Sequence, residues 1–139
     1  MFQKILVPTD LTDRSIKALE IAMNVAAPGT SQITLFHVIE TIAGAEDDEL
    51  SGFYRKLEQR ALKRMNDIVR DAGGERARVD IEVRYGKRAD EVLRHAGERQ
   101  ADLIVLPSHP PDLSRPRVSL GTMSYKLGVL APCSVLLVK

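Results

Sequence analysis

The hydrophobic pattern of this chain alternates between short apolar runs and longer amphipathic segments. Five runs have the β-branched residues or the period of two that is typical of strands. They are residues 4–8, 33–39, 79–85, 102–106 and 133–138. The segments between them repeat apolar residues every three to four positions, which predicts helices that pack by one face. We expect these helices over about residues 13–26, 53–72 and 88–99, with a fourth that starts at residues 121–122.

This order of elements predicts the fold class. Strands that alternate with helices are typical of an α/β protein whose parallel strands are joined by right-handed crossovers. The sequence therefore predicts a three-layer open parallel sheet with helices on both faces. Its length fits one hydrophobic core and no linker interrupts it, so we expect a single domain over residues 1–139.

Local residues predict where some elements begin and end. Pro8 lacks an N–H group and so ends the first strand. Thr12 is placed to cap the helix that follows it. Residues 40–52 are acidic and contain glycine, which predicts a surface loop. Residues 79–85 alternate strictly between apolar and polar, which predicts a half-exposed strand at an edge of the sheet.

Composition excludes several classes of function. Lys and Arg number 20 against 19 Asp and Glu, so we expect no nucleic acid to be held by bulk charge. No apolar run reaches the roughly 18 residues that span a bilayer, so we expect no membrane partner. Cys133 is the single cysteine, which favours a reducing, cytoplasmic setting. The histidines, His37, His95 and His109, are too dispersed to predict a metal site.

The expected topology also predicts where a ligand binds. In open parallel sheets, ligands bind beyond the carboxyl ends of the strands, where the strand order reverses. Three loops are expected to meet there: the loop at Thr9 and Asp10, the loop after Val38, and the loop that starts at Pro107. The helix predicted to start at Gly121-Thr122 adds free N–H groups and a positive dipole end, which favour an anion.

Several motifs stand in a fixed order along nearly the whole chain. The first part contains Lys4-Ile5-Leu6-Val7-Pro8-Thr9-Asp10, then Leu35-Phe36-His37-Val38, then Gly86 before Ala89-Asp90-Glu91-Val92-Leu93. The last part contains Ala101-Asp102-Leu103-Ile104-Val105, then Leu120-Gly121-Thr122, then Leu130-Ala131-Pro132-Cys133-Ser134-Val135-Leu136-Leu137-Val138. With these motifs the chain resembles the universal stress protein family.

The resemblance implies a more specific fold and a nucleotide site. It implies a Rossmann-like sheet of five strands in the order 3-2-1-4-5, similar to the adenine-nucleotide alpha-hydrolase fold, and a homodimer formed through the last strand. It also implies that ATP or another adenine nucleotide is a possible cofactor, with Asp10 at the ribose and Val38 at the adenine. The candidate binding residues are Pro8, Thr9, Asp10, Val38, Pro107, Ser108, His109, Pro110, Gly121, Thr122 and Met123.

The chain departs from the family in the loop that would hold the phosphates. The family motif is Gly-x-x-Gly, nine residues, then Gly-Ser/Thr, and Gly121-Thr122 matches its last pair. Pro107 and Pro110 stand where the two earlier glycines belong, and the spacer is one residue longer. Proline fixes φ and has no N–H to donate to an anionic oxygen, and each such hydrogen bond contributes about 1.5–3 kcal/mol. The loop is therefore predicted to be degenerate, unless the side chains of Arg115, Arg117, Lys87 or Arg88 supply positive charge in place of the lost donors.

Three functions remain open. The first is a cytoplasmic, homodimeric regulatory or interaction module in the stress response, with weak or no ATP binding and an unidentified protein partner. The last predicted strand, residues 135–138, is apolar. If it lies at an edge of the sheet, pairing with the same strand of a second copy would cover it. The second is an adenine-nucleotide sensor that uses Asp10, Val38 and Gly121-Thr122. The third is a slow nucleotide hydrolase, but no pair of residues is evident that would position water or hold a metal, so no catalytic residue is assigned.

Overall fold

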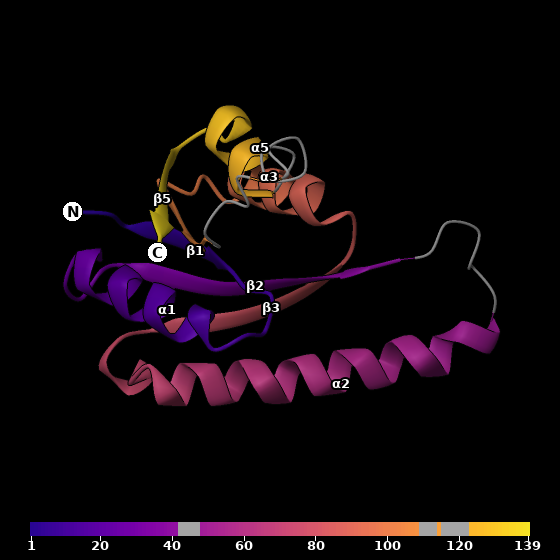
Figure 1. Cartoon of the computed structure of the whole chain (residues 1–139). Coiled ribbons are helices and arrows are strands. Elements are labelled where there is room, and N and C mark those ends of the chain that lie inside the picture. Colours follow the sequence, from indigo (N-terminus) through magenta and orange to yellow (C-terminus); the bar gives the residue numbers. More distant parts are fainter. Residues whose placement is uncertain (42–47, 109–113, 115–122) are drawn as a thin grey trace.

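The computed structural model describes residues 1–41, 48–108, 114 and 123–139. A parallel sheet in the order β3-β2-β1-β4-β5 lies between two layers of helices (Figure 1). The strands are β1 Lys4–Pro8, β2 Gln32–Glu40, β3 Val79–Gly86, β4 Leu103–Pro107 and β5 Ser134–Val138. The helices are α1 Arg14–Val25, α2 Asp48–Asp71, α3 Arg88–Glu98 and α5 Met123–Leu130, with a short 3-10 turn at Gly74–Arg76. The predicted fold class and strand order are confirmed.

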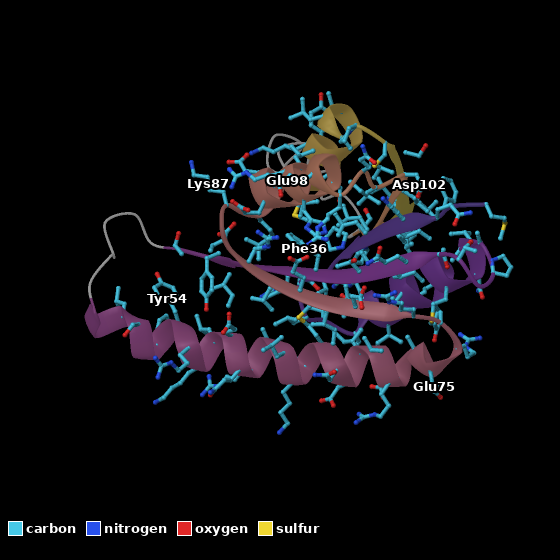
Figure 2. All side chains as sticks on the ribbon, turned by 180° about the vertical axis from the view of Figure 1, so that it is seen from behind. Phe36, Tyr54, Glu75, Lys87, Glu98 and Asp102 are labelled. Carbon is cyan, nitrogen blue, oxygen red and sulfur yellow. The ribbon has the colours of Figure 1, made fainter. Side chains whose placement is uncertain are left out.

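Each face of the sheet has its own apolar cluster. On the face of α1 and α2, Ile5 and Val7 of β1 pack with Leu19 of α1 and Met65 of α2. On the face of α3 and α5, the apolar cluster contains Leu6, Phe36, Val38, Val92, Ala96, Ile104, Leu106 and Leu127. Figure 2 shows Phe36 between the sheet and α3. Burial on both faces explains why the central strands read as continuous apolar runs.

The register brings the ends of the two central strands together. Leu6 of β1 is level with Ile104 of β4, so the carboxyl end of β1 at Pro8 lies beside Leu106 and Pro107. The order of connection reverses between these two strands, because β2 and β3 lie on one side of β1 and β5 lies beyond β4. This junction is the place at which the topology predicts a ligand.

Among the described strands, β3 and β5 lie at the two edges of the sheet. β3 pairs only with β2, which confirms the predicted edge strand, and β5 pairs only with β4. Among the described helices, none is both long and apolar enough to cross a membrane.

Two local predictions were wrong. Helix α1 begins at Arg14, and neither Thr12 nor the N-cap residue Asp13 caps it through a side chain. The Thr12 hydroxyl instead donates to the carboxylate of Asp10. Helix α2 begins at Asp48, so part of the segment predicted as a loop over residues 40–52 is helical. An acidic segment is compatible with the first turn of a helix because the helix dipole favours negative charge there.

Candidate functional site

A cavity of about 310 Å³ opens at the carboxyl ends of β1 and β4. We call it the switch-point cleft. Its lining comes from the ends of both strands and from the first residues of α3 and α5: Pro8, Thr9, Asp10, Arg88, Leu106, Pro107, Met123 and Ser124. The cleft therefore joins four elements that are distant in sequence, at the place that the topology predicts.

The loop after β1 forms one wall and is held from several sides. The backbone N–H of Thr9 donates to the carbonyl of Phe36 at 2.8 Å, which continues the β1–β2 pairing beyond Pro8. The Thr9 hydroxyl is bonded to Ser15 Oγ at 2.5 Å and accepts from the N–H of Leu11 at 2.9 Å. His37 Nδ1 lies 2.9 Å from the Thr9 carbonyl. Thr9 is buried, so these bonds fix the backbone from which Asp10 projects.

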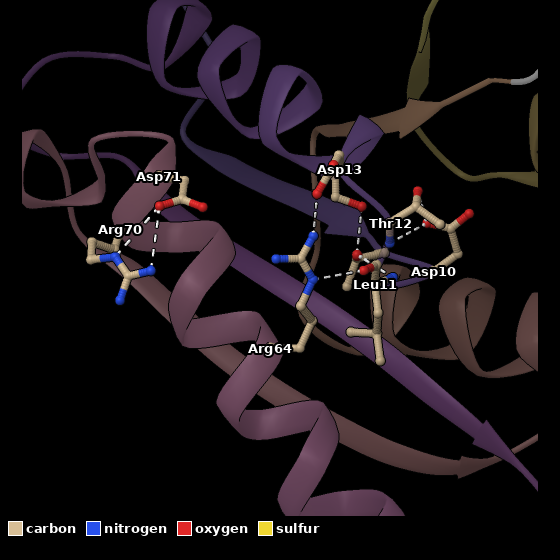
Figure 3. Close-up of polar contacts among 9 residues, drawn as sticks. Asp10, Leu11, Thr12, Asp13, Arg64, Arg70 and Asp71 are labelled. Atoms are coloured by element: carbon tan, nitrogen blue, oxygen red, sulfur yellow. Dashed lines mark hydrogen bonds and ion pairs between the residues drawn. The ribbon is translucent and has the colours of Figure 1, made fainter.

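Asp10 is exposed and shapes its own turn. Its Oδ1 accepts from the N–H of Thr12 at 3.0 Å and from the Thr12 hydroxyl at 2.6 Å (Figure 3). This is an Asx turn, the local arrangement that aspartate favours in loops. Asp10 thus braces the first loop, and it also lines the cleft.

Helix α2 braces the same loop from behind. Arg64 Nε donates to the Leu11 carbonyl at 2.9 Å, and its Nη2 pairs with Asp13 Oδ1 at 2.5 Å (Figure 3). Leu11 has φ of 69°, a left-handed conformation that side chains other than glycine rarely adopt. Such a residue persists where its surroundings determine it, and the Arg64 guanidinium supplies that constraint.

The opposite wall comes from the end of β4. Pro107 closes the strand opposite Val138 of β5 and has no N–H to offer a ligand. Ser108 follows, buried, with its N–H donating to the Val138 carbonyl at 2.9 Å. The Lys139 ammonium lies 3.5 Å from the Ser108 hydroxyl. The first part of this loop is therefore tied to β5.

The structure brings five of the predicted site residues to the cleft. Pro8, Thr9, Asp10, Pro107 and Met123 line the cavity. Ser108 is adjacent in sequence, and Val38 is buried in the cluster under α3 and not in the cavity lining. The remaining predicted residues, His109, Pro110, Gly121 and Thr122, lie outside the described residues.

Three lining residues were not among the predicted site residues. Arg88 was considered only as a source of charge, whereas Leu106 and Ser124 were missed. Each of the three is the first residue of its helix or lies one residue from the end of its helix or strand, at this edge of the sheet, and that position is the signal that could have found them. Arg88 is the first residue of α3 and pairs loosely with Glu40, at 3.8 Å.

A neighbouring cavity extends the site toward α3. It also has a volume of about 310 Å³ and shares Arg88 and Met123 with the switch-point cleft. Lys87 and Lys126 bring two further cations to its wall, and Glu40 and Asp90 bring two carboxylates. Together the two cavities offer an apolar slot, the Asp10 carboxylate and several cations. An aromatic base, a ribose hydroxyl and a small anionic group are the ligand parts that such a set can hold.

The family model that describes the universal stress protein family matches residues 1–139. The chain belongs to the universal stress protein family. Universal stress protein YxiE of Bacillus subtilis is 26% identical over 149 residues, with both chains covered completely. Membership supports a role in the stress response.

Solved structures of universal stress proteins share the fold. UspA from Lactobacillus plantarum superposes with a TM-score of 0.76 at 23% identity, covering 99% of this chain and 97% of that one. A universal stress protein in complex with cAMP has the same TM-score at 22% identity and the same coverage of both chains. At these identities the likeness establishes the five-stranded Rossmann-like sheet alone.

Proposed function

We propose that this universal stress protein acts as a homodimeric regulatory module of the stress response, joined through the edges of two β5 strands. One observation carries the proposal: β5 is an edge strand whose Leu136 and Leu137 are each 38% exposed. Beside it, α5 exposes Tyr125, Val129 and Leu130. An edge strand with exposed apolar side chains is a template for pairing, and a two-fold dimer covers it on both copies at once.

The proposal includes a cytoplasmic location, an unidentified protein partner and no catalytic step. Among the described residues, no group of three or more His, Cys, Asp or Glu side chains is placed to hold a metal. Cys133 lies immediately before β5 as a free thiol, a state that a reducing compartment preserves.

Hydrogen exchange on a dilution series tests the interface. If two β5 strands pair, the backbone amides of Ser134–Val138 are protected at high protein concentration and lose that protection as the dimer dissociates. The amides of β1, in the middle of the sheet, serve as the internal control and keep their protection throughout. Protection of β5 that does not depend on concentration would contradict pairing between copies.

A second function is favoured by the switch-point cleft: binding of an adenosine compound that carries few phosphates. Its volume lies at the lower end of small-molecule sites, and its lining is largely apolar with one carboxylate at the rim. Pro107 offers no N–H, so the cleft is poorer in phosphate donors than a glycine loop would be. The neighbour crystallised with cAMP, a nucleotide with a single phosphate group, supports this reading.

Calorimetric titration tests the second function. We expect AMP, cAMP or adenosine to bind at least as tightly as ATP. We also expect Asp10→Ala to weaken binding about tenfold or more, the effect of losing one hydrogen bond to a charged group. Asp67→Ala, the same change on the exposed surface of α2, is the matched control. ATP bound much more tightly than AMP would show that phosphate donors persist in the loop and would contradict the preference for few phosphates.

A further inference from the structure

The peptide group between Leu11 and Thr12 lies between an arginine and an aspartate (Figure 3). Its carbonyl, on Leu11, accepts a hydrogen bond from Arg64 Nε of α2 at 2.9 Å. Its N–H, on Thr12, donates to Asp10 Oδ1 at 3.0 Å. A peptide group is planar, so its carbonyl and its N–H turn together as one unit. A contact that holds the Leu11 carbonyl therefore also holds the N–H that Asp10 accepts from.

The backbone of Leu11 makes this peptide depend on an outside contact. The peptide before it is already held, because the Leu11 N–H donates to the buried Thr9 hydroxyl at 2.9 Å. The next peptide takes its direction from φ at Leu11, which is 69°. A residue with a side chain populates this left-handed conformation about tenfold less than the right-handed one. A hydrogen bond from a guanidinium is strong enough to offset that preference.

The ion pair of Arg64 does not account for this role. Arg64 Nη2 also contacts Asp13, but the Asp13 side chain is 89% exposed and that of Arg64 is 32% exposed. Exposed ion pairs contribute little to stability, because water screens them and the side chains lose freedom. The contact with Asp13 orients the guanidinium, and the bond to the Leu11 carbonyl is the one that acts on the loop.

Arg64 itself projects from a fixed backbone. The residue next to it, Met65, and Ile68 one turn further along α2 are both buried in the cluster under the helix. Rigid elements that are anchored in a core position a side chain more precisely than loops do. Helix α2 thus carries a fixed donor to a loop that lies at the carboxyl end of β1.

We propose that Arg64 is a positioning residue for the switch-point cleft. It is not among the described residues that line the cavity, whereas Asp10 is. Arg64 holds the peptide between Leu11 and Thr12, and that peptide holds the Asp10 carboxylate in the cavity wall. A carboxylate that is already ordered loses less freedom when a ligand hydroxyl binds to it. Arg64 therefore raises ligand affinity without touching the ligand, an effect that rests on the proposed binding of an adenosine compound.

Hydrogen exchange measured by NMR tests the positioning without a ligand. Arg64→Met removes the donors and keeps an unbranched side chain of similar helix propensity. We expect the Thr12 amide to exchange about tenfold faster in this variant, and the amides of β1, which report global unfolding, to change by a smaller factor. Arg70→Met is the matched control, because Arg70 lies on the same helix and pairs with carboxylates of α2 (Figure 3). An unchanged Thr12 amide in Arg64→Met would overturn the proposal.

Calorimetric titration with AMP tests the effect on binding. The apparent Kd rises as the fraction of molecules with the loop in place falls. We expect it to rise about tenfold in Arg64→Met and to stay unchanged in Arg70→Met. Asp13→Asn removes the ion pair and leaves the contact with the Leu11 carbonyl, so it should raise the Kd by no more than about twofold. An equal rise in Arg64→Met and Arg70→Met, or none in either, would overturn the proposal.

The double variant Arg64→Met/Leu11→Gly separates positioning from stability. Glycine adopts a φ of 69° without a steric cost, so the loop can regain its conformation without the arginine. The variant also loses the Leu11 side chain, which packs against the cluster of α1 and α2. We expect the Kd for AMP to return to within about threefold of the wild-type value, although urea denaturation shows lower stability than in Arg64→Met. Affinity that falls together with stability would overturn the positioning role.

The two measurements also keep the two proposals apart. A wild-type chain that binds neither AMP nor adenosine would contradict the proposed adenosine site. The exchange rate of the Thr12 amide in Arg64→Met would still support or overturn the positioning of the loop by Arg64.

Discussion

The two edge strands of the sheet, β3 and β5, differ in the kind of side chain that they expose. β3 carries charged side chains: Arg84 pairs with Glu82, and Arg78, immediately before the strand, lies 3.7 Å from Asp80. β5 carries Leu136 and Leu137, which are each 38% exposed, and it pairs on one side only, with β4. Charged side chains on an edge oppose pairing with another sheet, whereas apolar side chains favour it.

The difference explains how one chain can form a dimer and stop there. If both edges were apolar, each copy could pair at two sites and grow into an open chain. With β3 charged and β5 apolar, only one edge is available, and a two-fold pair closes the assembly. The contrast between the edges is thus the physical basis of the proposed dimer.

Breaking the apolar edge should have the largest effect. Leu137→Lys places two ammonium groups in a two-fold interface, one from each copy. If each costs the roughly 2 kcal/mol of an interface hot spot, the dimer dissociation constant rises about a thousandfold. Tyr85→Lys is the matched control, because Tyr85 is 40% exposed on the other edge strand. Light scattering after gel filtration reads the mass, and an unchanged dimer in Leu137→Lys would contradict the β5 interface.

Removing the charged side chains of β3 should make this edge as able to pair as β5. In the double variant Glu82→Val/Arg84→Val, β3 loses an ion pair and gains β-branched apolar residues. We expect species larger than a dimer, because both edges can then pair. Adding Leu137→Lys to this variant should return it to a dimer held by β3. Sedimentation velocity separates these species, and a double variant that stays dimeric would show that charge does not protect the β3 edge.

The β3 edge also carries a pH-sensitive contact that β5 lacks. The pKa of His95 is lowered from 6.5, mainly by burial and further by Arg99 and Arg84, while Glu82 and Glu98 act in the opposite direction. The unfolded chain then binds its proton at a higher pH than the folded chain does. The free energy of unfolding therefore falls as the pH drops below about 6.5 toward the folded pKa.

His95→Gln tests this dependence by removing the titrating group. We expect a shallower loss of stability over that pH range, measured by urea denaturation. The Leu137→Lys background keeps the protein monomeric, so that dimer dissociation does not add to the result. An unchanged slope in His95→Gln would show that another group causes the dependence.

The smallest expected effect concerns the reactivity of the Cys133 thiol, which lies immediately before β5. Burial, and after it the Asp102 carboxylate, raise the pKa of Cys133. Less thiolate is then present at neutral pH, so iodoacetamide should alkylate Cys133 more slowly than a model thiol. The rate should approach that of the model thiol in denaturant. Fast alkylation of the folded chain would contradict the buried setting of this end of the strand.

Much of the sheet could be predicted from the residues themselves. The apolar runs gave each strand to within a residue or two, and strict alternation at residues 79–85 predicted an edge. The rule that ligands bind at the carboxyl ends predicted Pro8, Asp10 and Pro107 at one cavity. The strand order came from the family resemblance, because periodicity does not determine how strands are arranged.

Other features depend on tertiary contacts that a linear pattern does not contain. Thr12 was predicted as a cap because its hydroxyl precedes a helix, but Asp10 competes for it and Arg64 of α2 holds the loop. Val38 was expected at the adenine, which stays a prediction, and the structure adds that the packing of α3 buries it. His95 was considered from the sequence only as a possible metal ligand, and its contact with Glu82 exists because α3 lies beside β3.

Sedimentation equilibrium of the wild-type protein tests the central claim most directly. The chain has a mass of 15.4 kDa. We expect a single species of twice that mass at micromolar concentration, and conversion to the chain mass in Leu137→Lys but not in Tyr85→Lys. A wild-type protein that remains at the mass of one chain at high concentration would contradict the dimer and the role assigned to β5.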